Sequence, residues 1–422
     1  MPEENKPKLF YGYIVVVASL IIISVMWGTF YSFGILLGPL QEDLGWTKET
    51  IIGAYALASL VSGFLGIATG GLSDKFGPKV ILVVCGFLLG SGYLLMSDIT
   101  AVWQLYLFYG GIIGVAMGGS VAPLTATIAR WFIKNRGMMM GVAVTGFGVG
   151  IMIVPAIVNH LVYNYNWATA CKIMGSAALV LIVAAALFLK RDPGQIGLLP
   201  YGYKESSKTG RSPKTSEFSY KEAIHFRQFW LLFVITLCYG IGMQAIMVHL
   251  VPYAMGVNIP AEKAATIMAT LGGVSIASRI ILGGIADRIG TRATYSIAFI
   301  LAAVALLWLV PSNMLWMLYL FAVIYGFAYG GESALRPLMV ADLFGLKSHG
   351  ITHGTIMLNL ALGGAIGPLM AASISETYGS YIPAFQICAV LGIIAFILTF
   401  LIKPTTSNED TPKGWIRKIW RR

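Results

Sequence analysis

Long apolar runs separated by short polar segments repeat along the whole chain. Each is about 20 residues or longer, the length that an α-helix needs to cross the hydrocarbon core of a bilayer. Strands of a membrane β-barrel are shorter and alternate in polarity, so the pattern favours helices. The sequence therefore predicts an all-α membrane protein whose twelve transmembrane helices span residues 11–40, 51–72, 78–97, 103–129, 138–160, 168–189, 229–253, 264–286, 293–310, 314–341, 351–375 and 381–402.

The composition agrees with a membrane protein. Of the 422 residues, 57% are apolar and only 11% are charged, which does not suit a surface that faces water on all sides. The four cysteines lie within apolar runs and show no CxxC spacing. They indicate neither a disulfide framework nor a thiolate metal site, and we expect no metal and no cofactor.

The distribution of positive charge predicts the orientation in the membrane. The net charge of +11 could indicate nucleic acid, but the cations are concentrated in alternate loops. With the amino terminus inside, the outer loops between the predicted spans hold only Lys48 and Lys263. This positive-inside bias predicts a multi-pass protein of the cell (inner) membrane with both termini in the cytoplasm and no nucleic-acid partner.

Two loop sequences recur at a constant spacing. GGLSDKFGPK at 70–79 and GGIADRIGTR at 283–292 are 213 residues apart (283 minus 70). The same offset relates two further sets of matching residues, Gly141, Gly150 and Pro155 with Gly354, Gly363 and Pro368. We infer two pseudo-symmetric six-helix bundles in parallel orientation, as in transporters that are built from repeats around a midplane site.

The repeat divides the chain into four predicted parts: an N-terminal bundle (1–190), a cytoplasmic linker (191–227), a C-terminal bundle (228–402) and a basic cytoplasmic tail (403–422). The linker is polar and mixed in charge, and it has room for one short surface helix near 220–226. The tail ends in GWIRKIWRR, which suits either an interfacial helix held by anionic lipid headgroups or positive-inside charge without a specific lipid.

The paired loops, of the form G-x-x-x-D-[RK]-x-G-x-[RK], resemble those of the major facilitator superfamily over essentially the whole chain. The stretch RWFIKNRGMMMGVAVTGFGVG at 130–150 is similar to the fifth-helix signature of monocarboxylate transporters and oxalate/formate antiporter-like proteins. The resemblance implies twelve helices in two bundles that rock around one central site. It also implies a gating role for the loop residues Gly70, Asp74, Lys75, Gly77, Gly283, Asp287, Arg288 and Gly290.

Arg279 stands inside the eighth apolar run, eight residues before Asp287, which is about 12 Å along a helix. A charge at that depth costs about 2.5–3.5 kcal/mol on insertion scales and usually faces a wet cavity or a partner. No acid lies three or four residues away, and the repeat places Gly66 at the equivalent position. These observations favour a binding site for a substrate carboxylate, a role that the resemblance also implies; the alternative is a buried inter-helix ion pair.

Other polar residues in the spans are candidates for the same site. Ser275, one turn before Arg279, offers a hydroxyl to the substrate or packs between helices. Tyr31, Tyr329 and Asn359 lie on spans one, ten and eleven, where each either lines a central cavity or packs against a neighbouring helix.

His249 and Glu332 are the candidates for proton coupling. His249 lies near the outer end of span seven, where a histidine either transfers a proton or is only a hydrogen-bonding residue at the interface. Glu332 precedes Arg336 by four residues, so the two form either a self-neutralised pair or a switch in which Glu332 pairs with Arg279 in the empty cavity. Animal-type monocarboxylate carriers usually have a lysine in span one and an aspartate where Ser275 stands, and this chain has neither.

The resulting prediction is a secondary transporter that moves a small organic anion, a monocarboxylate such as L-lactate together with a proton, by alternating access. The nearest rival is a dicarboxylate or formate-type antiporter, but two negative charges would need a second cavity cation, and only Arg336 is available. A transporter-like sensor without net flux is a third hypothesis. We predict no enzyme, because the chain has no Walker lysine, HExxH, GxSxG or paired carboxylates.

Overall fold

The computed structural model describes residues 10–203 and 217–403, and twelve helical spans in them are long and apolar enough to cross a membrane. The predicted spans are confirmed to within four residues at every end. The largest differences are at residues 40, 72 and 160, where the helices continue to Leu44, Phe76 and Asn164. The predicted tail helix at 414–422 lies outside the described residues.

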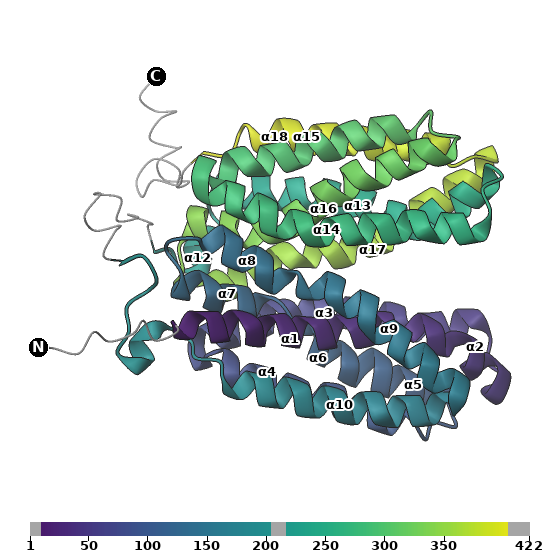
Figure 1. Cartoon of the computed structure of the whole chain (residues 1–422), viewed down its shortest axis with the longest axis horizontal. Helices are drawn as coiled ribbons and strands as arrows, with labels where there is room; N and C mark the ends of the chain where they lie inside the picture. The colour runs from purple at the N-terminus through teal and green to yellow at the C-terminus, as the bar shows by residue number, and fades with distance from the viewer. Residues whose placement is uncertain (1–9, 204–216, 404–422) are drawn as a thin grey trace, which may run out of the picture.

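The first half of the chain forms one bundle, drawn from purple to teal in Figure 1. Three of its six spans are interrupted helices, so the bundle contains the elements α1 (Tyr11–Tyr31), α2 (Phe33–Leu44), α3 (Lys48–Phe76), α4 (Pro78–Met96), α5 (Val102–Leu105), η1 (Tyr106–Ile113), α6 (Gly114–Gly118), α7 (Ala122–Trp131), α8 (Arg136–Val144), α9 (Gly146–Asn164) and α10 (Trp167–Leu187).

The second half forms the other bundle from six long helices. They are α13 (Arg227–Gly256), α14 (Ala261–Ile289), α15 (Thr291–Leu309), α16 (Leu315–Phe344), α17 (His349–Tyr378) and α18 (Ile382–Thr399). Two short helices follow the first bundle and precede the second in the sequence, η2 (Pro193–Ile196) and α12 (Tyr220–Ala223). The helix α12 lies within the segment where a surface helix is predicted. We call the end of the molecule where these segments lie the linker end, and the opposite end the far end (Figure 1).

The glycines of the repeated loops end two helices in the same way. Gly77 ends α3 with φ of 85°, and Gly290 ends α14 with φ of 92°. L side chains rarely adopt this backbone conformation, so glycine allows each chain to turn at once into the next span. The loop motif is therefore a tight reversal, made once in each half.

The two halves touch at the linker end through glycines that obey the same repeat. A Cβ on Gly70 of α3 would overlap the carbonyl oxygen of Gly350 at the start of α17, and one on Gly283 of α14 would overlap that of Gly137 in α8. Both partners are again 213 residues apart (350 minus 137). Small residues let helix backbones approach closely, which is a principal source of helix association within a bilayer.

Farther from the linker end, four glycines of α2 and α14 have no atom within 4 Å of where a Cβ would stand: Gly34, Gly38, Gly272 and Gly273. Apolar side chains of α9 such as Met152 and Ile157 are exposed there. The two bundles accordingly lie close together at the linker end and part toward the far end (Figure 1). The structure is closed at the linker end.

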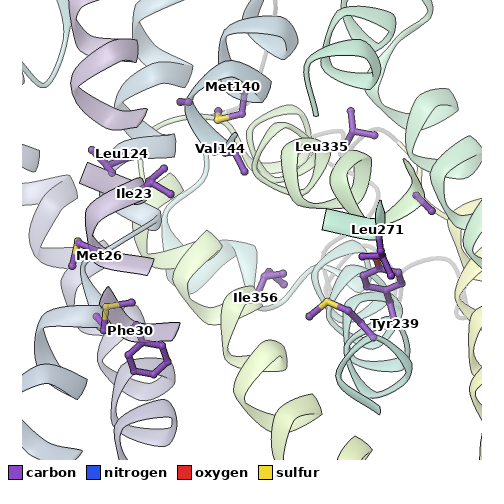
Figure 2. Close-up of a cluster of buried hydrophobic side chains, with 14 of the residues drawn as sticks. Ile23, Met26, Phe30, Leu124, Met140, Val144, Tyr239, Leu271, Leu335 and Ile356 are labelled. Atoms are coloured by element: carbon purple, nitrogen blue, oxygen red, sulfur yellow. The ribbon is translucent and has the colours of Figure 1, made fainter. Parts of the chain in front are cut away.

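The buried hydrophobic core contains apolar side chains from both halves, some of which are drawn in Figure 2. Met140 and Val144 of α8 are buried there, as are Leu335 of α16 and Ile356 of α17. Dense packing of buried side chains gains dispersion energy and is a principal source of helix association within a bilayer.

Adding a methyl group at Gly283 should shift the protein away from this closed linker end, because the Cβ would overlap the Gly137 carbonyl oxygen. Gly284 is a matched control, since no atom lies within 4 Å of its Cβ position. With spin labels at positions 163 and 263 on the far end, Gly283→Ala should populate shorter distances than Gly284→Ala. Identical distance distributions would contradict the packing argument.

Candidate functional site

A pocket lies between the two halves, on helices of both bundles. It contains about 480 Å³ of empty space, part of which is open to solvent. Its lining residues are Trp27, Tyr31, Val121, Phe147, Met243, Arg279, Tyr329, Ser333, Arg336, His353, Met357 and Leu360. A second pocket shares five of them, Trp27, Tyr31, Val121, Met357 and Leu360, so the two pockets lie next to each other, and together we call them the cavity.

Arg279 of α14 is the charged centre of this cavity. Its side chain is 1% exposed, and it donates hydrogen bonds from Nε to Ser333 Oγ and from Nη1 to Ser275 Oγ, each at 3.0 Å. Its guanidinium carbon lies 5.3 Å from the centre of the Tyr329 ring and 5.9 Å from that of Phe147. Hydroxyls and aromatic rings orient and partly stabilise the cation, but they do not neutralise it.

No carboxylate in residues 10–203 or 217–403 forms a salt bridge with Arg279. Both serines already donate their own hydroxyl protons, Ser275 to Gly272 O at 2.7 Å and Ser333 to Gly330 O at 2.8 Å. Their oxygens therefore act as acceptors toward the guanidinium. The arrangement holds a positive charge in place and leaves it available to an anion.

The second arginine of the cavity is neutralised within its own helix. Arg336 donates from Nε to Glu332 Oε1 at 2.7 Å and from Nη2 to Glu332 Oε2 at 2.5 Å, and the Glu332 side chain is 1% exposed. This is a bidentate pair in the favourable orientation, with the acid four residues before the base. Glu332 is paired with Arg336 in the empty cavity and not with Arg279.

The sequence-predicted residues fall into two groups. Tyr31 and Tyr329 line the cavity, and Ser275 lies behind it and holds Arg279. Asn359 instead donates to Phe233 O at 2.8 Å and to Thr236 Oγ1 at 2.7 Å, which joins α17 to α13.

His249 lies among the contacts between α13 and α17. Its Nε2 is 3.0 Å from Pro368 O, and its ring lies 5.1 Å from that of Tyr381. Pro368 is the proline inside α17, so this bond connects α13 to α17 at that proline. His249 is not among the described residues that line the cavity.

Sequence reasoning missed Ser333 and His353. Ser333 could have been found, because Tyr329, Ser333 and Arg336 follow one another at helical spacing and form one polar stripe on α16. His353 stands four residues after His349 in an apolar helix, a weaker signal, because two histidines on one face are equally compatible with helix packing.

The gating-loop aspartates bind across the interface. Asp74 of α3 accepts from Arg130 Nη2 at 2.7 Å and from the backbone N–H of Ile351 in α17 at 3.1 Å. Asp287 of α14 accepts from the backbone N–H of Gly137 at 2.7 Å and from that of Met138 in α8 at 2.9 Å. First-turn N–H groups lack partners within their own helix and carry positive partial charge, so each carboxylate closes the linker end onto the other half.

The fold and the cavity together define a twelve-helix membrane transporter with a central site. The family model described as Major Facilitator Superfamily matches residues 18–311 and, in a second match, residues 232–421. The chain belongs to this superfamily. It is a multi-pass integral membrane transporter of a small solute, and it is not an enzyme.

Similar proteins of known name match most of the chain. Monocarboxylate transporter 12 of Xenopus laevis is 27% identical over 363 residues, which cover 82% of this chain and 78% of that protein. The oxalate:formate antiporter of Oxalobacter formigenes is 26% identical over 401 residues, covering 92% and 90%. Among solved structures, the fucose:proton symporter FucP of E. coli matches with a TM-score of 0.70 at 16% identity over 93% of this chain and 100% of that one, which shows the shared fold.

Glu332→Gln should destabilise the protein strongly, because it leaves the Arg336 cation buried without its partner. Breaking a buried ion pair typically costs about 3–5 kcal/mol. Thermal unfolding in detergent measures the effect, and Glu332→Gln/Arg336→Leu should recover most of the loss. The control is Asp98→Asn, which removes an exposed pair with Lys172 (3.1 Å) and should leave the melting temperature nearly unchanged. Equal melting temperatures for Glu332→Gln and wild type would contradict the pairing.

Proposed function

We propose that this protein is a secondary transporter for a small organic anion, a monocarboxylate such as L-lactate moved with a proton, and that the anion binds Arg279. The observation that carries the proposal is a buried guanidinium in the cavity between the halves, held by Ser275 and Ser333 and unpaired with any carboxylate of the described chain. Buried charges are costly unless they are paired, so a substrate carboxylate would supply the missing partner.

The charge of the cavity favours one carboxylate over two. Arg336 is neutralised by Glu332, so Arg279 alone contributes uncompensated charge among the described lining residues. A dicarboxylate would bring a second negative charge that nothing in the described cavity balances. The apolar and aromatic surfaces of Trp27, Phe147 and Tyr329 suit a short carbon chain beside the carboxylate. The relatives named as a monocarboxylate transporter and an oxalate:formate antiporter support carboxylate transport as the general chemistry.

The anion site is linked mechanically to the gate. A Cβ on Gly141 of α8 would overlap the carbonyl oxygen of Arg279, so the backbone of this residue lies on the crossing between the halves. Opening the linker end must separate α8 from α14 and thus move Arg279 away from the N-terminal bundle. An anion that joins Arg279 to groups of both halves would bias that movement, which is what alternating access requires.

The orientation follows from the charges. Lys75 and Arg288 of the repeated loops are exposed at the linker end. The positive-inside bias supports a cytoplasmic position for this end. In that orientation the structure represents the state that opens outward.

Arg279→Ala should reduce kcat/KM for L-lactate uptake into proteoliposomes by about 10- to 100-fold, since a hydrogen bond to a charged group contributes about 1.5–3 kcal/mol. The kcat/KM of Arg279→Lys should lie between those of wild type and Arg279→Ala, because an ammonium keeps the charge but cannot form two parallel hydrogen bonds to a carboxylate. The matched control is Arg292→Gln, which removes a cation whose Nη2 binds Phe400 O at 2.8 Å, away from the cavity.

Three results would contradict the proposal, each in a different way. Unchanged affinity in Arg279→Ala would show that the anion binds elsewhere. Faster uptake of oxalate than of any monocarboxylate would favour the antiporter hypothesis. Lactate binding without flux in wild type would identify a sensor.

A further inference from the structure

His353 of α17 is a second ionisable group that lines the Arg279 cavity. Its side chain is 1% exposed, and its Nδ1 lies 3.1 Å from Thr125 Oγ1 of α7, so the contact joins the two halves. Its Nε2 is buried and has no hydrogen-bond partner in the described part of the chain. A buried polar nitrogen without a hydrogen-bond partner costs free energy, so its presence in the cavity lining calls for an explanation.

The hydrogen bonds of Thr125 indicate which ring nitrogen of His353 carries the proton. The Thr125 hydroxyl lies 3.1 Å from Val121 O and 3.2 Å from Ala122 O, the usual bonds by which a threonine inside a helix donates its one proton. Its oxygen then accepts from Nδ1–H of His353. In the neutral ring the lone pair is consequently on Nε2, which is free to bind a proton.

The immediate surroundings of His353 are net positive. The ionisable groups that line the same pocket are Tyr31, Arg279, Tyr329 and Arg336, and His349 lies one turn earlier on α17, whose other ionisable residues, Glu376 and Tyr378, lie at its opposite end. Two ion pairs on neighbouring helices, Asp74 with Arg130 and Glu332 with Arg336, add no net charge. Among these groups the remaining charge is that of Arg279, so a proton on His353 would place two unpaired cations in one buried space.

We propose that His353 Nε2 carries the co-transported proton, and that it binds this proton when an anion neutralises Arg279. The step is a simple addition: the Nε2 lone pair takes a proton from a hydronium ion of the solvent, which leaves a water molecule, and the imidazolium charge is balanced by the bound carboxylate. Both ligands then leave on the other side of the membrane, and the ring returns to its neutral form. Anion and proton each favour the binding of the other, which is the thermodynamic requirement for symport.

The two other candidates are less suited to this role. Both oxygens of Glu332 are occupied by Arg336, and His249 Nε2 is bonded to Pro368 O outside the cavity lining. The inference rests on the proposed anion site at Arg279, but a failure of one can be distinguished from a failure of the other.

The experiment compares His353→Asn with His349→Gln. The amide nitrogen that His353→Asn introduces can replace Nδ1 as donor to Thr125, but the amide cannot bind a proton near neutral pH. The control, His349, has its Nε2 2.9 Å from Pro337 O and does not line the cavity, and the Gln amide can keep that bond. Lactate–lactate exchange and net uptake driven by a pH gradient are measured in proteoliposomes, and proton uptake on lactate binding is measured in weakly buffered detergent solution.

Wild type and His349→Gln should take up close to one proton per lactate, and their affinity should fall by up to about tenfold per pH unit as the pH rises. His353→Asn should take up none, and its net uptake should no longer respond to the gradient. Lactate–lactate exchange by this variant should persist, because exchange needs no net proton movement, but it should lose the pH dependence of wild-type exchange.

The proposal is overturned if His353→Asn still takes up a proton with lactate. The proposed function is not overturned by that result, provided that lactate uptake still depends on Arg279. It is also overturned if this variant melts like wild type but no longer binds lactate, since His353 would then be an anion contact. A wild-type protein that binds lactate with no proton uptake anywhere between about pH 5 and 8 refutes it even if the variant does not fold. Absence of Arg279-dependent monocarboxylate transport in wild type would refute the proposed function itself.

Discussion

An unpaired guanidinium buried within a membrane protein is the constraint on which the site depends. Its desolvation is offset only in part by two serine oxygens and by the faces of Tyr329 and Phe147. The other arginine among the described lining residues, Arg336, is matched by Glu332 within α16, with the carboxylate almost fully enclosed. Under the proposed function, one uncompensated charge would select a ligand with one opposite charge, and the same excess charge would link a proton on His353 to that ligand.

The repeat explains how such a residue fits into a symmetrical scaffold. Gly66 and Arg279 are equivalent positions, and each presents its carbonyl oxygen to a glycine of the opposite half, Gly354 or Gly141. The close approach depends on the missing side chain of the partner glycine, not on that of residue 66 or 279. This position can therefore hold a large cation without loss of the helix crossing, whereas Gly141 and Gly354 cannot be enlarged. The C-terminal half can therefore carry Arg279 while both halves keep the same glycine crossing.

Much of the site can be predicted from residue spacing, and the remainder cannot. The absence of an acid one turn from Arg279 indicates a partner from outside its helix, and Tyr31 and Tyr329 are found by choosing polar residues in apolar spans. The same rule also selects Asn359 and His249, whose polar atoms bind neighbouring helices at the contact of α17 with α13. Burial in lipid requires polar groups to have partners, and helical periodicity does not say whether the partner is a backbone carbonyl or a substrate.

The sequence by itself determined the twelve spans, the two related halves and the tight loop turns, because these depend on the length of apolar runs, on a constant offset and on the backbone freedom of glycine. Only the tertiary structure decided that Glu332 pairs with Arg336, that Asp74 and Asp287 bind helix starts in the opposite half, and that His353 joins Arg279 in one cavity. These relations depend on how helices cross and rotate about their axes. Helix rotation is set by packing between distant segments, which no local pattern of residues records.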